Sequence, residues 1–405
     1  MPKPLSTPCR IVILGGGYAG LTVAQRLSQQ KTDALITLVD AKPAFEERIR
    51  LHQIAAGQRC PSFAYQAFLD GLGVRFLQGR ITALDPDAAR VCVTDVAGAA
   101  IELDYDYLVY ALGSAMDVSV AGVREHAWAF DSAKTAADLH ATLRQSPRAR
   151  ILVVGGGMTG IETATELTES LPTLQVTLAS SQPLRASQTA GGFSEGAVQY
   201  LTQSLAQRQI SLVSGARIHK LSEKNALMSD GRQLPFDACI WTSGFKPSPL
   251  AAQAGIQVDG EGKIAVDASL RSLSHPNIIA VGDAAGTSTE AAGACRMGSA
   301  TALAMAPAGA RTLAALLAGK APPPFRFVYL FRNICLGRDD GLVQFVDRRD
   351  VPRDMIWTGA AAARWKEYVC QGTLSIVGLS APERLPALPP LRMLPQLVHG
   401  LRQYA

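Results

Sequence analysis

The chain has 405 residues, more than one hydrophobic core usually spans, so two or three domains are expected. Hydrophobic residues make up 48% of it and charged residues only 18%, which excludes a disordered or fibrous protein. The 39 lysines and arginines exceed the 34 aspartates and glutamates by 5, without any basic run, so no nucleic-acid partner is expected.

The seven cysteines are scattered, with no close pair of the kind that binds zinc or forms a redox dithiol. None of the six histidines has a metal-ligand spacing, so no metal is expected. No apolar run precedes Ile11, and no apolar stretch of about 18 residues is free of charges and prolines. These features favour a cytoplasmic protein, either soluble or attached to a membrane surface.

A repeated motif organises the chain. Residues 10–20, RIVILGGGYAG, recur 140 positions later as residues 150–160, RILVVGGGMTG. In each copy a β-branched run enters a glycine turn, and a helical pattern then leads to a second apolar run at 34–40 or 174–180. Two βαβ units are therefore predicted, of the kind that binds a dinucleotide pyrophosphate at the helix N-terminus.

The glycines of this motif have separate tasks. The first makes the tight turn, the second lets the backbone approach a pyrophosphate, and the last lets helix and strand pack closely. They are Gly15, Gly17 and Gly20 in the first copy and Gly155, Gly157 and Gly160 in the second. The neighbouring residues Gly16, Tyr18, Ala19, Met158 and Thr159 are predicted to bind cofactor with them.

The residue 20 positions after the last glycine distinguishes the two sites. In the first copy it is Asp40, followed by Ala41, and a carboxylate there can accept hydrogen bonds from both hydroxyls of an adenosine ribose. In the second copy it is Ser180, with Arg185 shortly after, so no acid repels a 2′-phosphate. The second site therefore leans towards NADPH, with NADH as the alternative.

Further strands are predicted around the two units. An antiparallel sheet inserted in the first domain accounts for residues 74–84, 90–94 and 101–110. Residues 106–114 and 237–244 resemble each other and predict strands that cross between domains. A buried strand at 278–281 leads to Gly282 and Asp283, before an alanine-rich helical stretch at 290–317.

The order of these motifs resembles the flavoproteins with two dinucleotide-binding domains, the pyridine-nucleotide-dependent FAD oxidoreductases. The matching segments are 15–20 with Asp40, 110–114, 155–160, 241–245 and 280–285. Residues 157–167 are most similar to type II NADH dehydrogenases and apoptosis-inducing-factor-like reductases. The resemblance covers residues 9–318.

The resemblance implies an α/β fold with two Rossmann-like domains and a small C-terminal α+β cap. The FAD domain is discontinuous, at 1–115 and 246–320, with an NAD(P) domain at 116–245 and the cap at 321–405. The first glycine loop and Asp40 would hold the FAD adenosine diphosphate. The other implied FAD contacts are Ile81 at the adenine, Ala111 and Gly113 at the crossover, and Gly282 and Asp283 at the ribityl chain.

Four more residues are expected near the flavin. Glu162 matches the family's acid between nicotinamide and flavin, and a charge favoured by the helix dipole is the alternative. On a predicted charged helix at 45–53, Arg48 would pair with a phosphate and His52 would donate a proton, because imidazole titrates near neutral pH. A solvated helix with internal ion pairs is the alternative. Cys295 is placed on the 290–317 helix, as a reactive thiol or as a small core residue.

The implied activity is hydride transfer from NADPH or NADH to FAD, followed by electron transfer to a quinone-like or other small acceptor. No cysteine pair follows Asp40, which argues against a dithiol relay. Residues 292–300 replace the two-glutamine pattern of type II NADH dehydrogenases, which argues against a membrane quinone. The alternatives are a flavin oxidase or dehydrogenase that needs no nicotinamide, and a redox-sensing flavoprotein.

From Pro322 onward the sequence predicts strands at 325–331, 334–337 and 341–346 and a helix at 360–370. The tail at 391–402 mixes apolar and basic residues around Pro395. A peripheral membrane helix, a helix packed on the domain and a homodimer contact are the alternatives for this tail.

Overall fold

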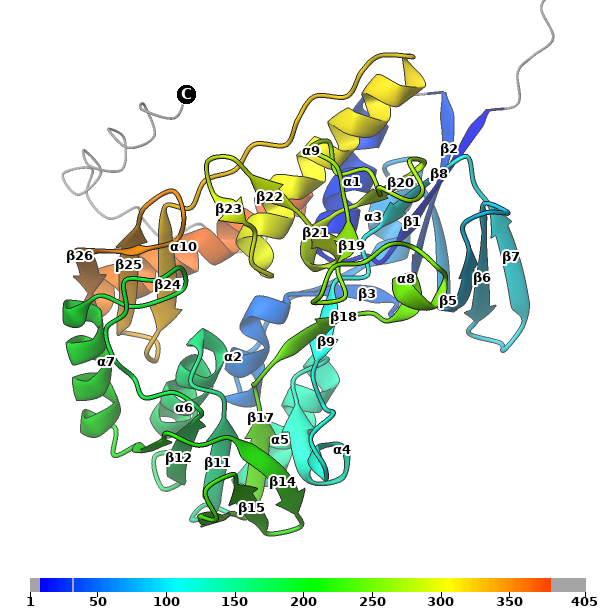
Figure 1. Ribbon diagram of the computed structural model, residues 1–405. Helices are drawn as coiled ribbons and strands as arrows, with labels where there is room; N and C mark the ends of the chain where they lie inside the picture. Colours follow the sequence, from blue (N-terminus) through cyan, green and yellow to red (C-terminus); the bar gives the residue numbers. More distant parts are fainter. Residues whose placement is uncertain (1–7, 31–32, 380–405) are drawn as a thin grey trace, which may run out of the picture.

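The computed structural model describes residues 8–30 and 33–379, and each copy of the glycine motif begins a sheet of its own. The first sheet has the order β20-β8-β1-β2-β5-β6-β7 and lies in the upper half of Figure 1, and the second has the order β10-β17-β11-β12-β13 and lies below it. The first comprises β1 (Cys9–Leu14), β2 (Ala34–Asp40), β5 (Arg75–Asp85), β6 (Arg90–Asp95), β7 (Ala100–Asp104), β8 (Tyr107–Tyr110) and β20 (Ile278–Ala280). The second comprises β10 (Ala127–Ala129), β11 (Arg150–Val154), β12 (Gln175–Ser180), β13 (Ser211–Ser214) and β17 (Ala238–Trp241).

Helices cover both sheets, so the central strands are buried on both faces and consist of aliphatic residues. The principal helices are α1 (Tyr18–Gln29), α2 (Leu51–Ala55), α3 (Tyr65–Asp70), α5 (Ala133–Arg144), α6 (Met158–Ser170), α7 (Glu195–Gln207) and α9 (Ser299–Leu317). The predicted α/β class with two Rossmann-like units is confirmed.

Helix α9 is long and apolar enough to cross a membrane by those criteria alone. However, 56% of the most apolar 18-residue segment of this helix is buried, and the helix packs along α1 in the first domain. Its composition is therefore that of a core helix.

The predicted inserted sheet is continuous with the first parallel sheet. Strand β5 pairs with β2 in parallel from Arg75 to Gln78, and from Gly79 onward it pairs with β6 in antiparallel. Strand β5 therefore belongs both to the parallel sheet and to its antiparallel extension.

The predicted crossing segments meet between the two domains. Strand β9 (Ser114–Met116) follows the first domain, β18 (Phe245–Pro247) follows the second, and the two pair in antiparallel. This short ladder fixes how one sheet lies relative to the other.

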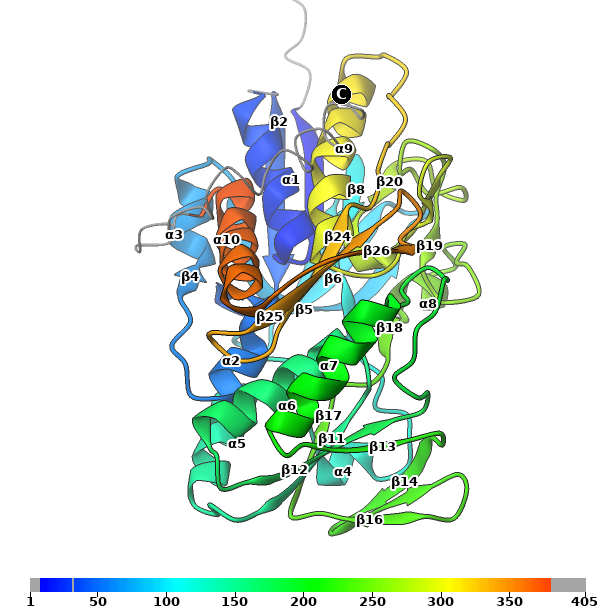
Figure 2. The same cartoon turned by 90° about the vertical axis from the view of Figure 1, so that its left-hand side faces the viewer.

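The C-terminal cap consists of β24 (Phe331–Cys335), β25 (Gly341–Val346), β26 (Pro352–Thr358) and α10 (Gly359–Val377). Figure 2 shows its sheet between α10, which packs beside α1, and α7 of the second domain. The strand predicted at 325–331 is wrong, since the ladder starts at Phe331, and β26 was not predicted. The tail at 391–402 lies outside the described residues.

Candidate active site

The first glycine loop has the geometry that its sequence predicts. Gly15 has φ +97°, and a Cβ there would lie 2.5 Å from the Ala111 carbonyl oxygen. A Cβ on Gly20 would lie 1.8 Å from the Gly15 oxygen, so helix α1 could not pack against β1. A Cβ on Gly17 would meet no atom within 4 Å. The loop therefore offers an open backbone edge to a ligand, next to the N-terminus of α1.

Asp40 lies at the carboxyl end of β2 beside this loop. Its Oδ2 accepts a hydrogen bond from the Gly16 amide at 2.6 Å, and its Oδ1 accepts one from the Lys42 amide at 2.8 Å. The Tyr65 hydroxyl donates to the Gly16 carbonyl at 2.8 Å, and a Cβ on Gly16 would lie 2.6 Å from the Tyr65 ring. Tyr65, from α3, was missed because nothing in its local sequence marks it. The open glycine edge, the helix N-terminus and the fixed carboxylate fit the adenosine diphosphate part of FAD.

Asp283 and Arg48 both contact Ser114 at the crossover. Asp283 accepts hydrogen bonds from the Ser114 hydroxyl at 2.6 Å and from the Gly298 amide at 2.7 Å. Arg48 donates to the Ser114 carbonyl at 2.6 Å, and its guanidinium lies 5.9 Å from the centre of the Phe245 ring. Residues from five segments thus lie together here, among them Asp283 and Arg48, for which the sequence predicts ribityl and phosphate contacts.

The remaining predicted FAD contacts surround this region. Gly282 has φ +72°, and a Cβ on it would lie 3.3 Å from the Cβ of Ala19. Ala111 is buried, and a Cβ on Gly113 would meet nothing within 4 Å. Ile81 is half-buried in the middle of β5, and Ala41 is exposed after β2.

The predicted placement of Cys295 on a helix is wrong. Residues 288–294 form a hairpin of β22 (Ser288–Thr289) and β23 (Gly293–Ala294), and α9 starts only at Ser299. Backbone pairing in this hairpin takes the place of the expected first helical turns. Burial raises the pKa of the Cys295 thiol to about 11, so the thiol is protonated at neutral pH and is not activated as a nucleophile.

The second glycine loop repeats the geometry of the first. Gly155 has φ +131°, and a Cβ on it would lie 2.5 Å from the Thr242 hydroxyl oxygen. A Cβ on Gly160 would lie 1.8 Å from the Gly155 oxygen, and one on Gly157 would meet nothing within 4 Å. Met158 and Thr159 form the first turn of α6. The loop is therefore open to a second dinucleotide.

Two cavities flank Ser180 at the end of β12. The larger, about 410 Å³, is lined by Gly156, Ser180, Arg185, Ser187 and residues 189–193 among others, and none of the described residues that line it is acidic. The smaller, about 270 Å³, is lined by Ser180, Arg217 and Gly244 among others, and also by Asp117, whose carboxylate pairs with Lys246 at 2.8 Å. Arg217 was not identified from the sequence as a residue of this site, because it lies after β13, far along the chain from the second glycine motif.

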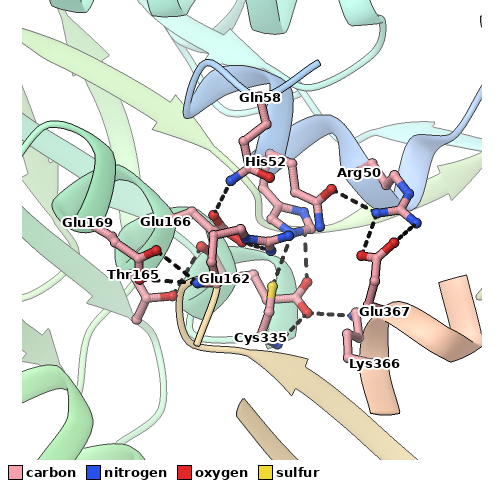
Figure 3. A network of polar contacts seen from close by, with 12 residues as sticks. Arg50, His52, Gln58, Glu162, Thr165, Glu166, Glu169, Cys335, Lys366 and Glu367 are labelled. Atoms are coloured by element: carbon pink, nitrogen blue, oxygen red, sulfur yellow. Dashed lines mark hydrogen bonds and ion pairs between the residues drawn. The ribbon is translucent and has the colours of Figure 1, made fainter. Parts of the chain in front are cut away.

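Glu162 is the centre of a buried polar junction between the three parts of the chain (Figure 3). Its Oε1 accepts hydrogen bonds from Lys366 Nζ on α10 at 2.7 Å and from the Cys335 amide on β24 at 3.1 Å. Its Oε2 lies 4.0 Å from Nδ1 of His52 on α2, and Nε2 of that imidazole lies 3.2 Å from Cys335 Sγ. The structure thus brings together the two predicted residues Glu162 and His52.

The pKa of His52 in this junction differs from the near-neutral value that was expected from the sequence. Burial, partly opposed by Glu162, lowers the pKa of His52 to about 4, so the assumption of a near-neutral imidazole is wrong. Burial raises the pKa of Glu162, but Lys366, His52 and hydrogen bonding more than offset it, and the net pKa is below its ordinary value. Burial raises the pKa of Cys335 well above that of a free thiol. At neutral pH the junction is therefore a carboxylate–ammonium pair beside a neutral imidazole and a thiol.

Further ion pairs and a hydrogen bond surround the junction. Glu166 on α6 accepts hydrogen bonds from Arg338 of the cap and from Gln58 at 2.6 Å. Arg50 donates to Glu367 on α10 at 2.7 and 2.8 Å and to Glu47 at 3.0 Å. The predicted charged helix at 45–53 is instead the end of β3 (Ala44–Glu46), a 3₁₀ turn and α2. Of its charged side chains, Glu47 and Arg50 are buried and Arg50 pairs with Glu367 of α10, whereas Glu46 and Arg48 are half-buried.

Comparison with known proteins places the repeat in a family. A family model described as pyridine nucleotide-disulphide oxidoreductase matches residues 9–298. An NADH dehydrogenase-like protein of Mycobacterium tuberculosis is 29% identical, over 68% of this chain and 72% of its own length. A type II NADH:quinone oxidoreductase of Staphylococcus haemolyticus is 26% identical, over 89% and 94%. The solved structure of NDH2 from Plasmodium falciparum in complex with NADH matches with a TM-score of 0.76 at 14% identity, covering 91% of this chain and 95% of that one.

Proposed function

The chain belongs to the pyridine nucleotide-disulphide oxidoreductase family and is an FAD-dependent NAD(P)H oxidoreductase. We propose that it oxidises NADPH in preference to NADH, on the evidence of its own nucleotide cavity, and that it reduces a quinone, as the named relative does. The observation that carries the nucleotide preference is the cavity beside Ser180. The larger of the two cavities there is lined by Arg185 and by no acidic side chain among the described residues, so a 2′-phosphate in it would gain an electrostatic partner and meet no repulsion.

We propose that the first glycine loop, Asp40, Arg48 and Asp283 hold FAD. The N-terminus of α1 would donate to the pyrophosphate, and Asp40 would accept from the ribose hydroxyls. Ser114 and the Gly298 amide fix Asp283 so that its carboxylate can face the ribityl hydroxyls. When bound, FAD supplies a flavin that accepts a hydride and passes electrons on. The proposed division into 1–115, 116–245, 246–320 and 321–405 follows from the same sites.

We propose that Glu162 and Lys366 act by positioning and by holding charge near the flavin. Their ion pair joins α6 of the second domain to α10 of the cap, while His52 brings α2 of the first domain to the same carboxylate. The first domain, the second domain and the cap are thereby joined at Glu162, and this junction would fix the distance between the two glycine loops. Precise placement of two reactants is the main contribution of the protein in such a reaction.

A quinone acceptor is supported by the relative from Staphylococcus haemolyticus, whose name specifies that acceptor and whose match extends over the cap. The two-glutamine pattern is absent at 292–300, so this support comes from the relative and not from that motif. A cytoplasmic location, contact with a membrane through the tail and a homodimer stay predictions.

Anaerobic titration of the purified flavoprotein with NADPH and NADH, followed by the flavin absorbance, tests the donor. We expect bleaching by both, at lower concentration with NADPH. Reoxidation by a short-chain soluble quinone, compared with ferricyanide as a nonspecific acceptor, tests the second half-reaction. No bleaching by either nucleotide would refute the donor assignment, and reoxidation by ferricyanide alone would refute the quinone.

A further inference from the structure

The cap reaches the nucleotide cavity through one buried arginine. Arg332, on β24, is 4% exposed, and its two terminal amino groups donate hydrogen bonds to the carbonyl oxygens of Gly191 and Gly192. Its guanidinium lies 5.2 Å from the centre of the Phe193 ring. All three loop residues line the cavity of about 410 Å³ beside Ser180. A residue of the cap therefore holds the wall of a cavity in the second domain.

Other cap residues hold the same loop by its backbone. The Gly191 amide donates to the Asp350 carbonyl at 3.1 Å, and the Ser194 amide donates to Oε1 of the fully buried Gln344 at 2.9 Å. Nε2 of Gln344 donates in turn to the Arg353 carbonyl at 2.6 Å. The loop thus takes its conformation from the cap as well as from its own sequence.

Arg332 is also linked to the first domain by a chain of ion pairs. Its Nε lies 3.3 Å from Oδ1 of Asp350, and Oδ2 of Asp350 lies 3.0 Å from Nε of Arg296. Arg296 stands two positions before Gly298, whose amide donates to Asp283 at 2.7 Å. Arg332 and Asp350 are almost completely buried, and separating a buried pair is costly, so the chain has little freedom to move.

We propose that Arg332 is a positioning residue for the nicotinamide nucleotide. Its side chain sets the shape of the cavity wall at Gly191 and Gly192. Through Asp350 and Arg296 it also connects that wall to the loop beside Asp283. The inference rests on the proposed function, because it requires the cavity to receive the adenosine end of the nucleotide. Arginine suits this position because a planar guanidinium can donate to two adjacent carbonyls while it faces a carboxylate and stacks on a ring. Lysine keeps the charge but offers one nitrogen in place of the two that Arg332 uses, and it lacks the planar group that stacks on the ring.

The substitution Arg332→Lys tests the proposal. We expect the KM for NADPH to rise about tenfold while kcat at saturating NADPH stays within about twofold, because uniform binding is lost and the chemistry is not. Flavin absorbance should be complete, and hydrogen exchange should become faster in residues 187–194. The matched control is Arg208→Lys, because Arg208 docks α7 on the cap through the Leu336 carbonyl and Asp340 instead of this loop. The control should leave KM and exchange in the loop unchanged.

A second variant keeps the proposal testable if Arg332→Lys fails to retain FAD. Phe193→Leu preserves apolar packing and removes the ring under the guanidinium, and we expect KM to rise about threefold with kcat retained. An unchanged KM with unchanged loop exchange in either folded variant would overturn the proposal. So would equal losses in kcat and FAD content, which indicate a purely structural role. If the wild-type protein is reduced by neither nucleotide, the proposed function fails, whereas the exchange measurement still tests whether Arg332 holds the loop.

Discussion

Replacing Lys366 by methionine would leave the Glu162 carboxylate buried without its cation. The two charged atoms lie 2.7 Å apart, and the side chains of Lys366 and Glu162 are only 13% and 8% exposed. Coulomb's law with an effective dielectric constant of about 20 gives roughly 6 kcal/mol of attraction at this distance. Desolvation cancels part of it, and breaking a buried pair on one side typically costs about 3–5 kcal/mol.

We therefore expect Lys366→Met and Glu162→Gln each to lower the free energy of unfolding by about 3–5 kcal/mol. The double variant should lose far less than the sum, because no unpaired charge is left buried, and the coupling energy should be at least about 3 kcal/mol. Glutamine at position 162 still offers an oxygen to the Cys335 amide, so the double-mutant cycle isolates the effect of removing the charge.

Urea unfolding of the FAD-loaded protein, followed by tryptophan fluorescence, gives the four free energies of the cycle. The matched control is the cycle on Lys134 and Asp138, an ion pair at 2.5 Å whose side chains are 83% and 51% exposed, and which should be additive. Additivity of the Glu162 and Lys366 substitutions within about 0.5 kcal/mol would refute the view that this pair joins the second domain to the cap.

Three other substitutions address the cofactor sites and the pH dependence. Asp283→Ala should purify without flavin, and full absorbance near 450 nm would contradict its assignment to the ribityl chain. Ser180→Glu should raise the KM for NADPH about tenfold with little change for NADH, and an unchanged ratio of the two KM values would refute the specificity argument. Burial raises the pKa of Glu47 from 4.5 to about 7, so the folded state binds its proton more tightly and the contribution of Glu47 to stability should fall by up to about 3 kcal/mol as pH rises from 4.5 to 7. The lowered pKa of His52 contributes in the opposite direction over this range, so the decrease is read from the difference between variants. Glu47→Gln should flatten this decrease in urea unfolding across that range, whereas its neighbour Glu46→Gln should keep it; equal slopes in the two variants would contradict the assignment.

The glycine loops were predictable from sequence because their requirements are local. A turn with positive φ at Gly15 and a close helix contact at Gly20 constrain residues that are adjacent in the chain, and Asp40 follows at a spacing set by one βαβ unit. The two crossing segments were predicted from the same repeat, whereas the strand order and the pairing of β9 with β18 come from the structure.

The junction was not predictable, because its residues are far apart in sequence. Lys366 and Cys335 lie 204 and 173 positions from Glu162, and each reads locally as an ordinary helix or strand residue. His52 was identified, but its pKa depends on burial by the cap, which sequence patterns do not reveal. Cys295 was misplaced because an alanine-rich segment predicts a helix, whereas its first residues pair as a hairpin.

The boundary of the family match separates two kinds of residue in this enzyme. Both glycine loops, Asp40, Glu162 and Asp283 lie within residues 9–298, whereas Lys366, Cys335 and Arg332 lie beyond it in the cap. The matched part supplies the chemistry that any two-dinucleotide flavoprotein needs. The cap supplies Lys366, the cation that pairs with Glu162, and Arg332, which donates to the loop at Gly191 and Gly192. In this chain the contacts that hold Glu162 and the loop at 191–192 therefore come from the cap, outside the matched range.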